Sequence, residues 1–201
     1  MIYLRSIPYG ADASQNLDIV FPKEKIAHAV VYIHGGAFMM GNKLQYPSFL
    51  ADYSRNNVFA SIDYRLVQHH NDICMEDILS DVNGALSKII ELSSANNVTV
   101  KDFILVGHSA GGHIGLLYGY KCHQEKIKIA ACVSLAGPTD FTDDYGWSSM
   151  TMWGDNPEER LSFLSQLGSR LAGHPIELKQ LNWTRQKIIR NSKNTLRIFL
   201  Q

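Results

Sequence analysis

The residues Gly107-His108-Ser109-Ala110-Gly111 form a pattern that can place a nucleophile at a sharp turn. An apolar run at 103–106 precedes them and 112–120 follows without strong turn signals, so we expect a strand before the serine and a helix after it. In this setting the serine hydroxyl is exposed above the end of the strand, close to the positive end of the helix dipole. A side chain at Gly107 or Gly111 would collide with neighbouring backbone. Ser109 is therefore the predicted catalytic nucleophile.

A glycine-rich turn can also be a purely structural corner or a loop that binds phosphate. A phosphate loop of the Walker type requires G-x-x-x-x-G-K-[ST], and this stretch has no lysine at the required position. The expected order of strand, turn and helix favours the nucleophile over both alternatives.

A second pattern, His34-Gly35-Gly36-Ala37, follows the apolar run 29–33 and stands about 70 residues before the serine. Acyl transfer places negative charge on the former carbonyl oxygen, and each backbone N–H aimed at that oxygen contributes roughly 3 to 4 kcal/mol. Side chains at Gly35 and Gly36 would block this approach. By itself the pattern is also typical of a tight turn. Its order relative to Ser109 predicts an oxyanion hole formed by Gly35, Gly36 and Ala110.

Short apolar runs alternate with stretches of helical period, which predicts an α/β fold with a mostly parallel sheet and helices on both faces. An early run at 17–21 is expected to be a strand, antiparallel and at the sheet edge. The other strands are expected at 29–33, 58–62, 103–106, 129–135 and 196–200.

Two helices are predicted from apolar spacing outside the serine motif. In the first, apolar residues recur through 78–90, with Asp77, Asp81 and Lys88 expected on the solvent side. The second begins after Asp155-Asn156-Pro157-Glu158-Glu159, which supplies a cap, a first-turn proline and acids, and its apolar face runs to Gly173. This helix either covers the active site or simply connects two strands.

Composition limits the classes of function. A chain of 201 residues with 45% hydrophobic content suits one core, so residues 1–201 are predicted to be a single domain. Because 19 basic residues balance 19 acidic ones, no net field would gather nucleic acid or an anionic membrane surface. No run approaches the roughly 18 to 20 apolar residues of a membrane span, the start lacks a signal peptide's apolar run, and three scattered cysteines suit a reducing compartment. We expect a cytoplasmic protein whose partner is a small molecule.

A polar cluster at His69, His70 and Asp72 lacks a further ligand of known placement. Solvated loop residues are therefore expected there, and no metal is expected to bind.

Four segments together resemble a known family: the stretch Tyr32-Ile33-His34-Gly35-Gly36-Ala37-Phe38, the later Asp63-Tyr64-Arg65-Leu66, the serine motif continued through Gly112-His113, and Ser134-Leu135-Ala136-Gly137. They resemble the carboxylesterase and lipase branch of the α/β-hydrolases, which includes hormone-sensitive-lipase-like esterases and kynurenine-formamidase-like enzymes. The resemblance covers residues 7–141 and continues more faintly to the end. It implies hydrolysis of carboxylic esters, or less often amides, through an acyl-enzyme at Ser109, with no metal or organic cofactor.

The resemblance also implies an acid and then a histidine after the serine. In similar proteins the acid follows a strand like the one expected at 196–200 and the histidine lies further on, so the chain is expected to be a fragment truncated at its C-terminal end. Within the chain, the alternatives are Asp140 as the acid and His174 as the base. His113, four residues after the nucleophile, is expected to pack rather than to react.

Three hypotheses remain open at this point. The chain is a truncated esterase-like hydrolase, a complete but divergent one that uses Asp140 and His174, or a catalytically silent α/β-hydrolase domain that binds a ligand or partner. Met39, Met40 and the aromatic stretch 145–153 weakly favour a small hydrophobic substrate.

Overall fold

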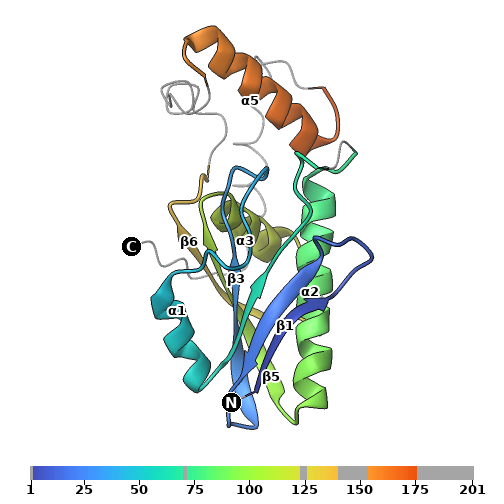
Figure 1. Cartoon of the computed structure of the whole chain (residues 1–201), viewed down its shortest axis with the longest axis vertical. Helices are drawn as coiled ribbons and strands as arrows, with labels where there is room; N and C mark the ends of the chain where they lie inside the picture. Colours follow the sequence, from blue (N-terminus) through green and yellow to red (C-terminus); the bar gives the residue numbers. More distant parts are fainter. Residues whose placement is uncertain (1, 70–71, 123–125, 140–153, 176–201) are drawn as a thin grey trace.

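A computed structural model describes residues 2–69, 72–122, 126–139 and 154–175 (Figure 1). Within these residues a single sheet has the strand order β1-β2-β4-β3-β5-β6. The strands are β1 (Ile2–Pro8), β2 (Asn16–Phe21), β3 (Ile26–Ile33), β4 (Val58–Ile62), β5 (Thr99–His108) and β6 (Ile129–Leu135). The helices are α1 (Ser48–Asp52), the 3₁₀ turn η1 (Tyr53–Arg55), α2 (Met75–Ala95), α3 (Ala110–Lys121) and α5 (Pro157–Ala172).

The sheet is parallel at its centre and antiparallel toward one edge. Strand β3 pairs in parallel with β4 and β5, and β5 pairs in parallel with β6. Strand β2 runs antiparallel to β4, as expected for the early strand. Its expected position at the edge is wrong, because β1 pairs on its outer side. No residue of β1 is fully buried. Its apolar residues are only the short run Ile2-Tyr3-Leu4 and Ile7, separated by Arg5 and Ser6, which is too little to predict a strand.

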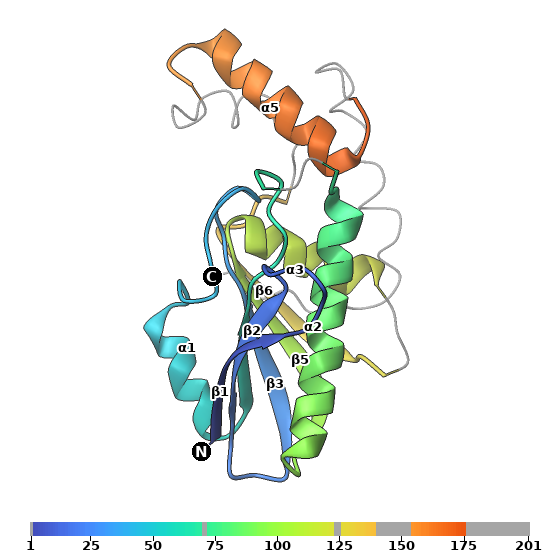
Figure 2. The same cartoon turned by 45° about the vertical axis from the view of Figure 1, so that its right-hand side comes forward.

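Helices lie on both faces of this sheet, which confirms the expected α/β architecture. Helices α2 and α3 contact each other and pack on the same face, α2 on β2, β4 and β5 and α3 on β3, β5 and β6. On the other face, Leu50 of α1 packs in a smaller apolar cluster with Tyr32 and Phe59. Figure 2 shows α1 on the side of the sheet opposite α2 and α3.

The predicted apolar face of α2 is buried, but one of its acids was assigned to the wrong side. Asp81 is only 1% exposed and accepts hydrogen bonds from the Arg65 side chain, at 2.7 Å from Nη2, and from its backbone N–H at 3.0 Å. A carboxylate can be buried in this way because hydrogen bonds from a guanidinium and a backbone amide compensate the loss of its hydration. Helical spacing alone carries no information about such a partner.

Helix α5 begins and ends as its sequence predicts. The Asn156 side chain accepts a hydrogen bond from the Glu159 N–H at 2.9 Å, and Gly173 closes the helix in the left-handed conformation with φ 73°. Both views place α5 beyond the carboxyl ends of the parallel strands (Figures 1 and 2). The strand expected at 196–200 and the aromatic stretch 145–153 lie outside the described residues.

Candidate active site

The two glycine patterns meet at the carboxyl edge of the sheet. Strands β3 and β5 are parallel neighbours, with Ile33 opposite Gly107, so the residues that follow them emerge side by side. A Cβ atom built on Gly35 would lie 3.1 Å from the Ser109 Cβ and 2.8 Å from the His108 carbonyl oxygen. The backbone of the first pattern therefore contacts the serine directly, and only a glycine allows that approach.

Ser109 occupies a strained turn between β5 and α3. Its φ of 51° is in the left-handed region, which is unusual for a residue other than glycine, and its N–H donates to the Leu135 carbonyl at 2.8 Å. A Cβ on Gly107 would lie 2.1 Å from the Gly111 carbonyl oxygen, and a Cβ on Gly111 would lie 2.0 Å from that of Ile33. Both flanking glycines are thus required by close backbone contacts. The half-buried serine stands at the N-terminus of α3.

The loop after β3 doubles back on itself within a few residues. Gly36, Ala37 and Phe38 all have positive φ, at 114°, 54° and 65°, and the N–H groups of Met39 and Met40 both donate to the Gly36 carbonyl at 3.0 Å. A Cβ on Gly36 would lie 1.9 Å from the Met40 carbonyl oxygen, so this turn excludes any side chain there.

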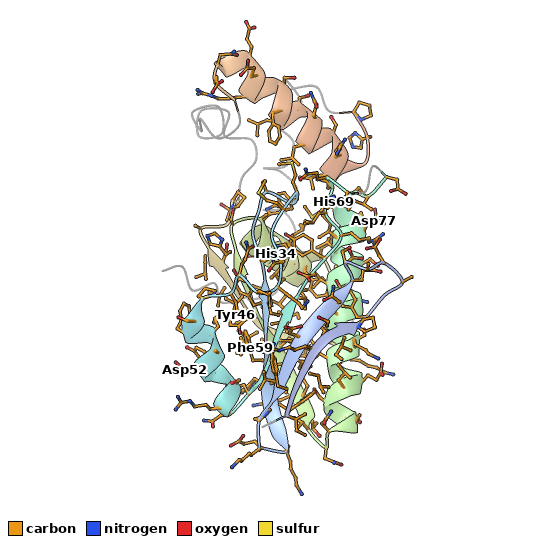
Figure 3. All side chains as sticks on the ribbon, in the orientation of Figure 1. His34, Tyr46, Asp52, Phe59, His69 and Asp77 are labelled. Atoms are coloured by element: carbon orange, nitrogen blue, oxygen red, sulfur yellow. The ribbon has the colours of Figure 1, made fainter. Side chains whose placement is uncertain are left out.

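His34 is buried at the base of this loop, where Figure 3 shows it at the carboxyl edge of the sheet. Its Nδ1 lies 2.7 Å from the Gly35 carbonyl oxygen, which can only accept, so Nδ1 carries the hydrogen. Burial lowers the pKa of His34, against smaller opposing effects of that hydrogen bond and of Asp63. A trans peptide directs its C=O and N–H to opposite sides, so the bond that holds the Gly35 carbonyl turns the Gly36 N–H away from the imidazole.

His113, on the first turn of α3, packs as expected. It is buried, its Nδ1 donates to the Pro138 carbonyl at 2.9 Å, and the Phe38 ring meets it edge-on at 6.0 Å between centroids. Burial lowers its pKa, opposed by the bond to Pro138. This histidine links α3 to the loop after β3 and to the segment after β6.

The predicted acid and base stay predictions. Asp140 lies outside the described residues. His174 is exposed just after the end of α5, and its Nδ1 lies 3.1 Å from the carbonyl oxygen of Pro175. Helix α5 is tied to the body of the protein by Arg170, which donates to the Val67 carbonyl at 2.9 Å.

One polar cluster beside the site was not found from the sequence. Lys43 is 9% exposed, and its ammonium reaches the side chains of Asn16, Asp18 and Asp63. Asp63 belongs to a motif already noted for the family resemblance, but Lys43 stands in a loop where a lysine is normally solvated. Only the pairing of β2 with β4 brings its partners together.

A groove of about 320 Å³ lies elsewhere, between α1 and the antiparallel strands. Tyr46 and Phe59, which line it, appear below His34 in Figure 3. Its lining includes neither the glycine turn at 34–41 nor the serine turn at 107–111.

In the part of the chain that the structure describes, no group of three His, Cys, Asp or Glu residues is arranged to hold a metal ion. No helix described by the structure is long and apolar enough to cross a membrane.

Comparison with known proteins gives a consistent result. The BD-FAE family model matches residues 17–182, which include both glycine patterns. The non-reducing polyketide synthase atr1 of Stereocaulon alpinum is 27% identical over 157 residues, which cover 70% of this chain and 6% of that protein. A probable isoprenylcysteine alpha-carbonyl methylesterase ICME of Oryza sativa subsp. japonica is 30% identical over 115 residues, or 55% of this chain and 27% of the relative. The chain thus spans less than a third of the length of either relative.

Among solved structures, an inhibited esterase B from Lactobacillus rhamnosis superposes with a TM-score of 0.67 at 15% identity. The match covers 99% of this chain and 75% of the esterase. At this identity the likeness concerns the fold, and it confirms the expected α/β-hydrolase fold.

Proposed function

The chain belongs to the BD-FAE family, and from this membership we propose that it is a serine hydrolase that cleaves carboxylic esters of small hydrophobic acids through an acyl-enzyme at Ser109. The observation that carries the proposal is the close approach of the Gly35 backbone to the strained Ser109. A Cβ atom added to Gly35 would lie only 3.1 Å from the Cβ atom of Ser109. The similarity to esterase B and to the probable ICME methylesterase also supports the proposal, because both proteins are named for ester hydrolysis.

The proposed reaction begins with attack by the Ser109 hydroxyl oxygen on the carbonyl carbon of the ester. The hydroxyl proton passes to a base, and the carbonyl oxygen becomes an oxyanion that accepts hydrogen bonds from backbone N–H groups. We assign these donors to the loop at Gly35 and Gly36 and to Ala110 at the start of α3. Collapse of the intermediate breaks the bond to the alcohol oxygen, which takes the proton back from the base. Water then attacks the acyl carbon and gives a proton to the base, and the Ser109 oxygen leaves and recovers that proton as the acid is released.

His34 and the helix dipole support this assignment. Because the His34 imidazole holds the Gly35 carbonyl at 2.7 Å, the following N–H is free to face the substrate side. The N-terminus of α3 adds positive potential at Ser109, where the oxyanion develops. Met40, which is 58% exposed directly after this loop, favours an apolar acyl group.

For the base and the acid, His174 and Asp140 remain the alternatives within the chain. A base must reach the serine hydroxyl directly or through one water. His174 is exposed and faces the Pro175 carbonyl, so the proposal rests on Ser109 and its donors rather than on either alternative. The cytoplasm is the proposed compartment, in keeping with Cys74, Cys122 and Cys132, which are unpaired in the described residues.

Fluorophosphonate labelling of the full chain, with mass spectrometry of the modified peptide, tests the proposal. Modification at Ser109 is expected, and Ser109→Ala should abolish it. Ser87→Ala, an exposed position on α2, is the matched control that keeps the label. A folded chain that takes no label, or that keeps it in Ser109→Ala, contradicts the proposal and favours the silent ligand-binding domain. A series of nitrophenyl esters of increasing acyl length then tests the apolar preference.

A further inference from the structure

The cluster around Lys43 joins the loop beside Ser109 to the antiparallel side of the sheet. The Lys43 ammonium donates to the Asn16 side chain at 2.5 Å and to Asp63 Oδ2 at 3.3 Å, and it lies 3.6 Å from Asp18. Its side chain is only 11% exposed. A buried ammonium is costly unless charge and hydrogen bonds compensate it, so these contacts fix the position of Lys43 strongly.

The backbone of Lys43 is fixed by the same neighbours. Its N–H donates to Asp63 Oδ1 at 2.6 Å, and its carbonyl accepts from the Ser61 hydroxyl at 2.5 Å. Asp63 is itself held from β2, because its N–H donates to the Asn16 carbonyl at 2.9 Å. One carboxylate therefore binds both the main chain and the side chain of Lys43.

This anchor lies two residues after the point where the loop returns to the site. A Cβ built on Gly41, where φ is 105°, would lie 2.5 Å from the Gly35 carbonyl oxygen and 2.6 Å from His34 Nδ1. The returning arm of the loop is thus in van der Waals contact with the residue that lies against Ser109. A shift of Lys43 would be transmitted through Gly41 to Gly35.

We propose that Lys43 and Asp63 are positioning residues, which set the oxyanion loop against Ser109 by clamping its returning arm to the end of β4. Neither side chain is assigned a contact with substrate. The effect of the clamp on catalysis rests on the proposed function, whereas its effect on the position of the loop does not.

Variants separate the two halves of the clamp. Asp63→Ala removes the acceptor for both Lys43 contacts, Asp63→Asn keeps an oxygen that can accept the Lys43 N–H, and Lys43→Met removes only the ammonium. The matched control is Asp102→Ala, which also deletes a buried carboxylate, one that pairs with His28 at 2.5 Å. Asp102 lies seven residues before Ser109 on β5, which is roughly 20 Å along a strand.

Amide hydrogen exchange in the full chain is the readout that does not depend on activity. Exchange in peptides covering 34–43 is expected to speed up at least tenfold in Asp63→Ala and in Lys43→Met, less in Asp63→Asn, and not at all in Asp102→Ala. Unchanged exchange in this segment in a folded Asp63→Ala or Lys43→Met chain overturns the proposal. Lys43→Met decides the question if Asp63→Ala fails to fold.

The kinetic readout is the rate of acylation at Ser109 by a nitrophenyl ester or fluorophosphonate. The maximal rate of acylation is expected to fall about 10- to 100-fold in Asp63→Ala, because loss of a whole oxyanion donor lowers turnover by about 10² to 10³. The reagent concentration that gives half of the maximal rate is expected to change less than about twofold. Asp63→Asn should recover part of the rate. An equal loss in Asp102→Ala would show a general effect of stability and overturn the clamp. A wild-type chain without reaction at Ser109 counts against the proposed function, and the exchange experiment still decides the clamp.

Discussion

The ring of His34 is stacked on the ring of Tyr64, with centroids 4.4 Å apart and planes inclined by 15°, while the Tyr64 hydroxyl donates to the His34 carbonyl at 3.0 Å. The tyrosine therefore holds both the side chain and the main chain of the histidine. Because His34 in turn holds the Gly35 carbonyl, the segment just after β4 helps to orient the Gly35–Gly36 peptide in the loop after β3.

The first prediction concerns the turn at Gly36. Gly36→Ala should lower the rate of acylation by about 10² or more, since the new Cβ can be accommodated only if the oxyanion donors move. Gly115→Ala on α3 is the control, because its Cβ would meet neighbours no closer than 3.7 Å. It should keep the rate and raise stability by about 0.5 to 1 kcal/mol. Acylation at the wild-type rate in a folded Gly36→Ala chain would remove this loop from the mechanism.

The second prediction is a loss of stability in mild acid. Burial lowers the pKa values of His34 and His113 in the folded chain below the reference value of 6.5, so below that pH the unfolded chain binds more protons. The stability that these neutral rings provide is present above about pH 6.5 and is lost as the pH falls below it. Urea midpoints measured between pH 8 and pH 5 check this.

A substitution of His113 separates the contribution of its imidazole to this acid sensitivity from that of His34. His113→Gln should show a shallower decline of the urea midpoint in acid than the wild type, whereas His69→Gln, at an exposed position, should leave the decline as it is. A decline that His113→Gln leaves unchanged would show that this buried imidazole is not a source of the acid sensitivity.

The third prediction compares two buried serines. The Ser134 hydroxyl, packed against Gly112, has no hydrogen-bond partner within the described part of the chain, whereas that of Ser61 donates to the Lys43 carbonyl at 2.5 Å. Ser134→Ala should therefore be neutral or stabilising by up to about 1 kcal/mol, and Ser61→Ala destabilising by about 1 to 3 kcal/mol. Denaturant unfolding of both variants gives the comparison, and the reverse order would contradict it.

The fourth prediction contrasts a buried ion pair with an exposed one. Asp81→Ala removes a carboxylate that is 1% exposed from Arg65, whose side chain is 22% exposed, and should cost about 3 kcal/mol. Asp52→Ala breaks a pair with Arg55 in which both side chains are more than 70% exposed, and it should change stability by less than about 0.5 kcal/mol. Similar unfolding free energies for the two variants would show that burial does not govern these pairs.

The sequence predicted the centre of the fold better than its margin. Strands β4 and β6 begin and end as expected, because each is an apolar run closed by turn residues. Strand β1 is not predicted, since Arg5 and Ser6 interrupt its short apolar pattern. Helix α1, with five residues and Leu50 as its one buried side chain, is too short for a helical period.

The same limit applies to the site. Both glycine patterns could be recognised because their chemistry requires particular residue types in a local order. Lys43 and Asp81 could not be placed, because the burial of a charge depends on partners that come from distant segments. Asp63 and Arg65 supply these partners, and sequence spacing does not indicate which cation or anion they face.

The pairing of β3 with β5 has a consequence for the order of folding. Residues 34–98 separate the two strands, and this segment contains β4 and the whole of α2. Contacts between segments so distant along the chain form late, because closing the long loop costs entropy before any contact is gained. The serine and the loop that faces it are therefore expected to meet late in folding, so that the chemistry of this edge appears when the central strands join.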